Sequence, residues 1–372
     1  MDHRDNSVVT KPIRVAVIGY GLSGAVFHVP LVTSTPEMEL VSVVTGDPGR
    51  QARVRVAVPG VRVVDNTDQL WAAGADHDLV VIATPTGTHL AVGLAAIEAG
   101  LPMVVDKPMA TTAADSRTLA TAAAARGLWL SVFHNRRWDG ETLTIQRLLS
   151  DRALGAVTRF ESRFERWRPE PHPAAWRDRT GTEDGGGILL DLGSHLVDQA
   201  TYLFGRPLSV YAEVERRRPG GQGDDDVFIA LEHADAVRSH LWASAVAANL
   251  GPSVRVLGLA GAYVKEGLDI QEEGLRSGAR PGRPDWGREA PDLWGRLWTG
   301  GDSGPVETVP GDWPAYYVGV VESLRSGTPP PVTADDGIAV LEVLDAARES
   351  ARRRQVIAIP SVSIASANPA DT

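Results

Sequence analysis

A glycine-rich turn near the start of the chain constrains its fold more than any other feature of the sequence. Gly19, Gly21 and Gly24 follow the apolar run IRVAVI and precede a helical pattern. In a strand–turn–helix unit, the first glycine permits a tight turn, the second lets the backbone approach a pyrophosphate, and the third allows close packing of helix on strand. The N-terminus of that helix then faces the phosphates. We therefore predict dinucleotide contacts from the whole turn: Gly19, Tyr20, Gly21, Leu22, Ser23 and Gly24.

The residues after this turn alternate between strand-like and helix-like runs, which strengthens a motif that is weak by itself. The short apolar runs lie at 13–19, 40–46, 78–84, 102–106 and 128–133. Helical patterns between them end at Gly100 and Gly127, and a glycine just past a helix is a common C-terminal stop. Apolar strands alternating with helices are typical of a parallel sheet covered on both faces. The sequence thus predicts an α/β fold with a doubly wound, dinucleotide-binding Rossmann domain over residues 1–132.

After the last of these runs, the pattern changes to alternating apolar and polar positions. The alternation covers 156–167, 209–218 and, less cleanly, 226–246. A period of two marks antiparallel strands with one covered face. A long helical stretch lies at 185–205, and an amphipathic helix follows at 337–354. We therefore expect residues 133–372 to form a substrate-binding and oligomerisation domain with helices and a large, mostly antiparallel open sheet.

The composition excludes several kinds of chemistry and partner. A net charge of −10 argues against a nucleic-acid-binding protein, which normally carries a basic patch, and gives no reason to expect a membrane as partner. The sequence has no cysteine, which excludes disulfides, thiolate metal sites and cysteine nucleophiles. The polar start of the chain lacks a signal peptide, and no run of about 18 apolar residues occurs to span a membrane. We expect a cytoplasmic protein.

The end of the second apolar run bears on the choice of nicotinamide cofactor. NAD-binding sites place an acid on the ribose hydroxyls about twenty residues after the glycine turn. Here the run ends in Thr45, which removes repulsion toward a 2′-phosphate, and Arg50 is close enough in sequence to reach that phosphate. Asp47 could equally turn back and favour NAD, and Arg50 could be a solvated surface charge. The sequence favours NADP, with NAD as the alternative.

The triplet Asp106-Lys107-Pro108 supplies the first candidate catalytic residue. It ends the apolar run at 102–106, at the carboxyl edge where ligands of parallel sheets bind. An ammonium at this place can donate a hydrogen bond to a substrate hydroxyl. The proline restricts Lys107 to extended geometry. The alternative is a lysine that merely emerges into solvent at a strand end.

The second candidate set is Asp191 and His195, which lie four residues apart and therefore on one face of a helix. Hydride transfer from an alcohol requires a base for the hydroxyl proton, and histidine titrates near neutral pH. A carboxylate one turn away can orient the imidazole or bind substrate. The alternative is a buried histidine satisfied by a carboxylate. A metal site that adds Asp198 has suitable spacing but no further ligand cluster, so we predict no metal.

The segment SVFHNRRWD (131–139) lies where the two predicted domains join. Its histidine, asparagine and two arginines supply many hydrogen-bond donors, which suits a hydroxyl-rich substrate in a cleft. The same residues could equally form a polar network between the domains. The loop at 164–178 offers two more candidates, unless they lie on the surface. The predicted substrate-binding residues are His134, Asn135, Arg136, Arg137, Arg168 and Trp176.

Several motifs together resemble the Gfo/Idh/MocA oxidoreductases along nearly the whole chain. These motifs are GYGLSG after IRVAVI, ATPTGTH (83–89), Asp-Lys-Pro (106–108) and GGGILLDLGSHLVDQ (185–199). Their combination is much more specific than any one of them. Further segments resemble the NADP-preferring scyllo-inositol dehydrogenase branch of that family, namely FHVPLV (27–32), SVFHNRRWD (131–139) and DIQEEGLRSG (269–278).

The resemblance implies hydride transfer between a nicotinamide and a secondary alcohol or ketone of an inositol-like polyol or a sugar. In the catalytic set that it implies, His195 takes the hydroxyl proton, Lys107 anchors the reacting oxygen, and Asp191 helps to hold substrate and imidazole. A cis bond between Lys107 and Pro108 is also implied. Besides Thr45, Asp47 and Arg50 of the turn discussed above, the predicted cofactor contacts are Thr84, Pro85, His89, Asp106 and Lys107.

The resemblance leaves some properties open. Related proteins are usually homodimers or homotetramers joined through the second-domain sheet, so we expect one of these. The family triplet is most often Glu-Lys-Pro, and the shorter Asp106 could change how Lys107 is held. Two alternative functions on the same fold are a non-catalytic regulator that senses NAD(P) and a glycosidase that uses NAD transiently.

Overall fold

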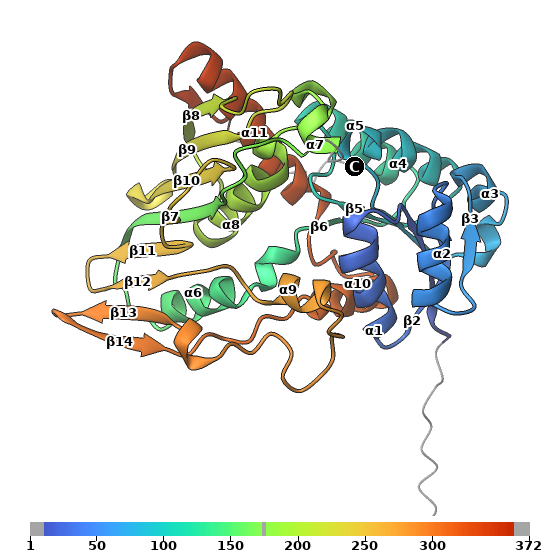
Figure 1. The fold of residues 1–372 in the computed structure, drawn as a ribbon, viewed down its shortest axis with the longest axis horizontal. Coiled ribbons are helices and arrows are strands. Elements are labelled where there is room, and N and C mark those ends of the chain that lie inside the picture. Colours follow the sequence, from blue (N-terminus) through green and yellow to red (C-terminus); the bar gives the residue numbers. More distant parts are fainter. Residues whose placement is uncertain (1–10, 173–175, 361–372) are drawn as a thin grey trace, which may run out of the picture.

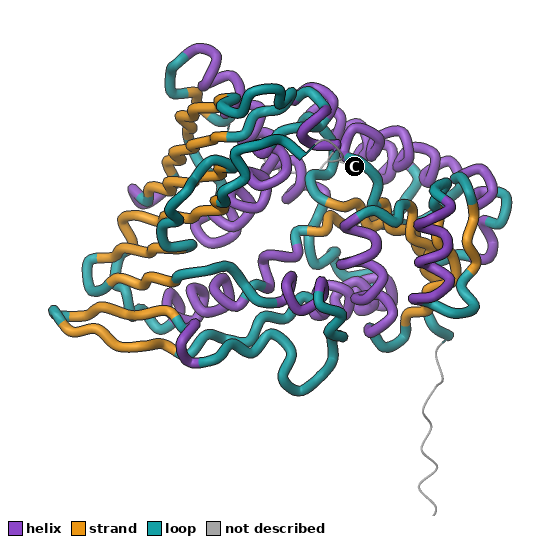
Figure 2. Tube along the Cα trace, in the orientation of Figure 1, coloured by secondary structure: helices purple, strands orange, loops and turns teal. Residues whose placement is uncertain are grey.

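The chain folds around two sheets, which lie side by side with helices around and between them (Figure 1). The computed structural model describes residues 11–172 and 176–360. Figure 2 shows the strands in two separate groups. Within the described ranges, no helix is long and apolar enough to cross a membrane.

The first sheet has six parallel strands in the order β3-β2-β1-β4-β5-β6. Its strands are β1 (Ile13–Ile18), β2 (Met38–Val44), β3 (Arg62–Val64), β4 (Leu79–Ile82), β5 (Met103–Asp106) and β6 (Leu130–Phe133). The side chains of β4, β5 and β6 are buried throughout, as expected for a sheet covered on both faces. This confirms the predicted doubly wound parallel sheet.

Local sequence features explain where several helices of this region begin or end. The helices are η1 (Ser23–His28), α1 (Val29–Ser34), α2 (Pro48–Ala57), α3 (Thr67–Trp71), η2 (Gly74–Asp76), η3 (Thr86–Thr88), α4 (His89–Glu98) and α5 (Ala113–Ala125). The side chains of Asp47 and Thr112 accept backbone hydrogen bonds at the starts of α2 and α5. Gly100 and Gly127 follow α4 and α5 with φ of 73° and 63°, which confirms the predicted helix stops.

The second sheet has nine strands in the order β14-β13-β12-β11-β7-β10-β9-β8-β15. Its strands are β7 (Val157–Glu165), β8 (Ser209–Glu215), β9 (Asp226–Glu232), β10 (Arg238–Ser244), β11 (Val254–Gly258), β12 (Ala262–Lys265), β13 (Gly295–Thr299), β14 (Asp302–Val306) and β15 (Ile357–Ala358). Only β7 and β10 pair in parallel, and the other pairs are antiparallel. The sheet is therefore mixed but mostly antiparallel, as predicted.

The helices of the second region pack on this sheet and on the first one. They are η4 (Asn135–Trp138), α6 (Gly140–Ser150), α7 (Trp176–Arg179), η5 (Thr182–Asp184), η6 (Leu189–Gly193), α8 (Ser194–Phe204), η7 (Ala234–Ala236), α9 (Gln271–Arg276), η8 (Pro291–Leu293), α10 (Pro314–Ser326) and α11 (Ala334–Arg353). The helix expected over 185–205 begins only at Leu189. Gly185 and Gly187 have φ of 90° and 84°, which is incompatible with a right-handed helix.

The long helix α11 connects the two sheets. It contacts α5 and β6 of the first region as well as α8 and β8 of the second. The Asp345 carboxylate accepts a hydrogen bond from the backbone N–H of Ala113 at 2.8 Å. In Figure 1, β5 and β6 lie on the side of the first sheet that faces α8. The domain boundary after residue 132 remains a prediction, but the last helices pack on both sides of it.

Candidate active site

The turn between β1 and η1 has the close contacts that its glycines predict. Gly19 has φ of 102°, and a Cβ added there would lie 2.5 Å from the carbonyl oxygen of Ala83. A Cβ on Gly24 would lie 2.0 Å from the oxygen of Gly19. A Cβ on Gly21 would meet no described atom within 4 Å, so its backbone faces open space. The turn thus fits a dinucleotide pyrophosphate at the start of η1.

The residues weighed for cofactor choice share one turn at the end of β2. Thr45 is buried, and its N–H donates to the oxygen of Val64. The Asp47 Oδ1 accepts a hydrogen bond of 2.7 Å from the backbone N–H of Arg50, whose side chain is exposed. Asp47 therefore caps α2 while the Arg50 guanidinium is available beside it. This arrangement is compatible with either cofactor.

The loop after β4 is tied to the Asp-Lys-Pro triplet by a histidine. The buried ring of His89 places Nε2 2.9 Å from the oxygen of Thr84 and Nδ1 3.0 Å from the oxygen of Pro108. Pro85 immediately precedes η3, and the peptide bond between Lys107 and Pro108 is cis, as the resemblance implies. The two ring nitrogens of His89 thus face backbone carbonyls, and this side chain holds two predicted cofactor loops together.

Asp106 is the last residue of β5, and its carboxylate lies beside His28 of η1. Its Oδ1 accepts from the backbone N–H of Lys107 at 2.8 Å, and its Oδ2 lies 3.7 Å from the His28 Nε2. Burial alone would raise the pKa of the Asp106 carboxyl. The His28 imidazole and the Lys107 ammonium outweigh burial and hold that pKa well below its ordinary value. The short carboxylate is therefore ionised and fixed beside Lys107.

The Lys107 side chain crosses from the first sheet to the second region. Its Nζ donates to the main-chain oxygen of Asp191 at 2.6 Å and to the Asp191 Oδ1 at 3.1 Å. Only 11% of the side chain is exposed, so it does not simply emerge into solvent. Two of the three predicted catalytic residues, 84 positions apart in sequence, are therefore in direct contact.

His195 lies in the first turn of α8, four residues after Asp191. Asp191 lies in the π-helical segment η6, which leads directly into α8. Such π-helical turns are frequent at functional sites. The His195 ring is 8% exposed and stacks on Phe164, with 6.4 Å between ring centroids. Asp198, considered above for a metal, instead accepts from Arg137 at 2.7 Å.

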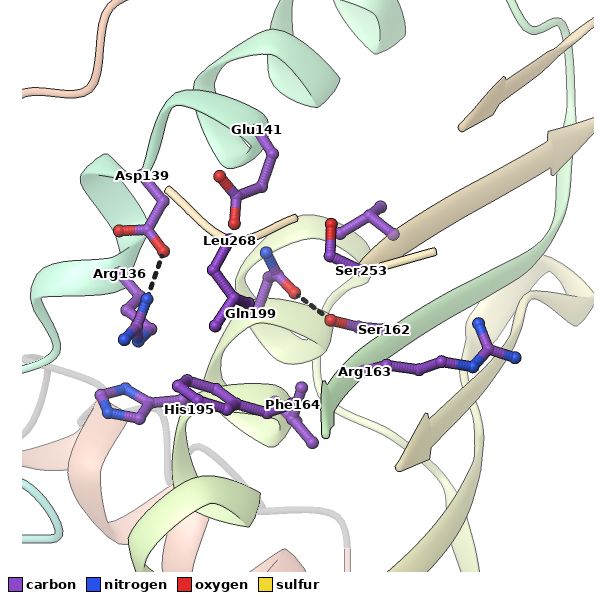
Figure 3. A pocket seen from close by; sticks show the side chains of 12 residues that line it. Arg136, Asp139, Glu141, Ser162, Arg163, Phe164, His195, Gln199, Ser253 and Leu268 are labelled. Carbon is purple, nitrogen blue, oxygen red and sulfur yellow. Dashed lines mark hydrogen bonds and ion pairs between the residues drawn. The ribbon is translucent and has the colours of Figure 1, made fainter. Parts of the chain in front are cut away.

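A small, partly open pocket lies beside His195 (Figure 3). Its polar lining includes Arg136, Asp139, Glu141, Ser162, Gln199 and Ser253. Arg136, a predicted substrate-binding residue, donates to the Asp139 Oδ2 at 3.0 Å and to the Glu272 Oε2 at 2.9 Å. The pocket therefore combines donors and acceptors, as a hydroxyl-rich ligand requires.

The other predicted substrate-binding residues do not line this pocket. His134, Asn135 and Arg137 are buried, and Arg137 makes a two-pronged ion pair with Asp198. Burial lowers the pKa of His134, although the nearby Asp198 opposes this. Arg137 thus belongs to a polar network, while the substrate-binding role of these three residues stays a prediction. Arg168 is exposed, and Trp176 lies half-buried in α7.

Most residues of the pocket lining were not predicted from the sequence. Ser162 and Phe164 lie two positions apart on β7 and so face the same side of the sheet. Gln199 follows His195 by four residues on α8, so the helical spacing could have identified it. Glu141, in the first turn of α6, carries no sequence signal that separates it from an ordinary N-terminal helix acid.

Two family models match the chain, and together they cover most of the described residues. A Gfo/Idh/MocA profile described as an oxidoreductase family, NAD-binding Rossmann fold, matches residues 13–134, and the C-terminal alpha/beta domain of that family matches residues 146–359. The chain is 37% identical to scyllo-inositol 2-dehydrogenase (NADP(+)) IolW of Bacillus subtilis, over 93% of this chain and 95% of the relative.

Two further comparisons involve oxidoreductases without a named substrate. The Escherichia coli oxidoreductase YdgJ is 40% identical over 93% of this chain and 99% of its own length. The solved structure of the Bacillus subtilis oxidoreductase YvaA superposes with a TM-score of 0.88 at 35% identity, covering 94% of this chain and 99% of that one.

Proposed function

Because the chain belongs to the Gfo/Idh/MocA family of oxidoreductases, we propose that it transfers a hydride between NADP and a secondary alcohol or ketone of a cyclic polyol or sugar. The relative named as an NADP-dependent scyllo-inositol dehydrogenase supports an inositol-like substrate and this cofactor. NAD remains the alternative cofactor, because Asp47 and Arg50 share the turn that would meet the ribose.

The contact between Lys107 and Asp191 carries the proposal. It brings an ammonium from the carboxyl edge of the first sheet to the helix end from which His195 enters the pocket. A lysine at this place donates to the reacting oxygen, and the imidazole takes the hydroxyl proton. The Asp191 carboxylate holds the ammonium in position. When bound, the nicotinamide accepts or returns the hydride.

The dinucleotide would lie along the carboxyl edge of the first sheet. The glycine turn fits the pyrophosphate, because Gly21 leaves open space there, and the neighbouring loops come from the ends of β2, β4 and β5. We assign the cofactor contacts to Gly19, Tyr20, Gly21, Leu22, Ser23, Gly24, Thr45, Asp47, Arg50, Thr84, Pro85, Asp106 and Lys107. We assign His89 a positioning role, because its ring joins two of these loops.

The proposal is tested by a screen of inositol isomers and aldoses with each cofactor, followed by nicotinamide absorbance. We expect turnover with at least one cyclic polyol and a larger kcat/KM with NADP than with NAD. A ratio near unity, or one that favours NAD, contradicts the cofactor preference. The absence of any absorbance change would favour a regulator, and cleavage of glycosides without net cofactor consumption would favour a glycosidase.

The proposed role of His195 is tested with one variant and one control variant. We expect His195→Asn to lower kcat by about 10²- to 10⁴-fold, because the variant lacks a base for the hydroxyl proton. His240→Asn, on β10 beside Phe228, lies outside the pocket lining and should retain wild-type turnover. Equal turnover of both variants contradicts the assignment. A cytoplasmic location and a homodimer or homotetramer remain predictions from the sequence.

A further inference from the structure

Two buried carboxyl groups, Asp139 and Glu141, line one end of the pocket, and a third, Asp269, lies near enough to interact with Glu141 electrostatically. Asp139 accepts from the Trp313 Nε1 at 2.6 Å and from the Arg136 Nη1 at 3.0 Å. Asp269 accepts from the backbone N–H groups of Gly140 and Gln271, each at 2.7 Å. The protein thus supplies donors to both oxygens of each aspartate.

Glu141 is different from its two neighbours. Its side chain is 3% exposed, and its Oε2 has no hydrogen-bond partner among the described residues. A buried polar atom without a partner costs about 1–3 kcal/mol, so native structures rarely keep one without a reason. Figure 3 places Glu141 and His195 at opposite sides of the pocket, with the Glu141 carboxyl directed toward the space between them.

A second buried atom on the same pocket also lacks a partner in the described part of the chain. The Arg136 Nη1 and Nη2 are occupied by Asp139 and Glu272, but its Nε has none. The guanidinium is held over the Phe164 ring at 4.7 Å, so its position is fixed. The pocket therefore presents a donor, the Arg136 Nε, and an acceptor, the Glu141 Oε2, that have no hydrogen-bond partner among the described residues. A ligand hydroxyl can accept a hydrogen bond and donate one.

The protonation state of Glu141 also favours a hydrogen bond to a hydroxyl group. Burial, with the charges of Asp139 and Asp269, raises the pKa of Glu141 well above its ordinary value, against the opposing charge of Lys265. Lys265 cannot neutralise Glu141 fully, because its Nζ already lies 3.0 Å from Glu289 Oε1. A carboxyl that retains its proton can both donate to and accept from a hydroxyl.

We propose that Glu141 is a further substrate-binding residue, which holds a hydroxyl on the part of the substrate remote from the reacting carbon. It also restricts the pocket to uncharged polyhydroxylated molecules. The second part follows because both arginines of the lining, Arg136 and Arg163, are already paired with carboxylates. A sugar acid or sugar phosphate would therefore find no unpaired arginine in this lining for its anion. The inference rests on the proposed function, whose substrate class it narrows.

The test measures binding of scyllo-inositol to the protein saturated with NADP by isothermal titration calorimetry. We expect Glu141→Leu to weaken binding about 10- to 100-fold, because one hydroxyl loses its partner inside a buried pocket. Glu141→Gln keeps a donor and an acceptor and should retain most of the affinity. Glu307→Leu, an exposed site near β14, is the matched control and should bind as the wild type does. The melting temperature and NADP affinity of each variant verify its folding.

A second part of the test compares a neutral ligand with a negatively charged one. The wild-type protein should bind myo-inositol at least tenfold more tightly than myo-inositol 1-phosphate, because both arginines of the pocket lining are already paired with carboxylates and cannot neutralise the phosphate. Equal or tighter binding of the phosphate overturns the inference, as does unchanged affinity in Glu141→Leu or no binding of either polyol by the wild type. If polyols bind and Glu141→Leu weakens them while no turnover occurs, this inference stands and the proposed function fails. If turnover occurs and Glu141→Leu changes nothing, the proposed function stands and this inference fails.

Discussion

At the scale of single residues, the site depends on charged groups that the fold forces together in places with little water. Lys107 is held by Asp191 across the gap between the two sheets, and Asp106 is held by the backbone of Lys107 and the ring of His28. Each of these groups has a protein partner that fixes its position. Such fixed groups can act on a substrate without first reorganising.

Replacement of Lys107 tests this arrangement directly. We expect Lys107→Met to lower kcat/KM by about 10²- to 10⁴-fold, because the reacting oxygen loses its donor, and to weaken NADP binding far less, because Lys107 is one of many assigned cofactor contacts. Steady-state kinetics and a cofactor titration check the two parts. Lys11→Met, at an exposed lysine, is the matched control and should behave as the wild type does. Wild-type turnover in Lys107→Met would remove this residue from the proposed mechanism.

The raised pKa of Glu141 gives a prediction about stability and pH. Because the native pKa lies above the ordinary glutamate value, the native protein holds this proton over a pH range in which the unfolded chain has lost it. The contribution of Glu141 to stability therefore falls as the pH rises through that range. Glutamine does not titrate, so Glu141→Gln should melt higher relative to the wild type at about pH 8 than at about pH 5. Thermal unfolding at both pH values checks the sign, and the reverse trend contradicts it.

At the scale of elements, the turn from β1 to η1 shows how two identical residues can have different roles. A side chain on Gly24 would collide with the backbone of Gly19, whereas one on Gly21 would enter open space. The absence of a side chain at Gly24 is therefore needed for folding, whereas its absence at Gly21 leaves room for the ligand. This division matches the roles that the glycine spacing predicts for a dinucleotide site.

Two alanine variants separate these roles. We expect Gly21→Ala to keep its free energy of unfolding within about 0.5 kcal/mol of the wild type but to bind NADP at least tenfold more weakly, since the methyl group blocks the pyrophosphate. Gly24→Ala should lose both stability and binding, because its Cβ meets a carbonyl oxygen at 2.0 Å. Urea unfolding and a cofactor titration measure the two properties. Unchanged NADP affinity in Gly21→Ala would mean that the cofactor does not approach this turn.

At the scale of the whole molecule, the C-terminal helices complete the first sheet. Gly337 of α11 packs so closely that a Cβ there would lie 2.9 Å from the side chain of Val132 on β6. Tyr316 of α10 donates a hydrogen bond of 2.8 Å to Ser131 on the same strand. The first sheet thus depends on residues about 200 positions later in the sequence, so the two regions are expected to unfold together.

This dependence predicts the behaviour of a fragment. We expect residues 11–134 expressed alone to be unfolded or aggregated, because β6 would lose the cover of α10 and α11 and expose its apolar side chains. Circular dichroism and thermal unfolding of the fragment check this against the full chain. A cooperative unfolding transition of the isolated fragment would show that the first sheet is an independent folding unit.

Local patterns in the sequence were sufficient to predict five of the six strands of the first sheet and the strands β7 to β10 of the second, but not β3 or β11 to β15. They also predicted the glycine turn and the helix stops at Gly100 and Gly127. These features depend on hydrophobic periodicity and on residues with special backbone preferences, and both operate over a few neighbouring positions. The start of the helix at Leu189 was missed, because the two glycines before it were read as part of the helical stretch.

The tertiary structure alone decided which polar residues meet. It brought Lys107 to Asp191, buried Arg137 against Asp198, and placed Glu141 at the pocket end opposite His195. The sequence could not reveal these pairs, because an arginine that binds substrate and one that bridges two helices have the same local pattern. Their roles depend on distances between segments that are far apart in the chain, and those distances are set by the packing of the two sheets and α11.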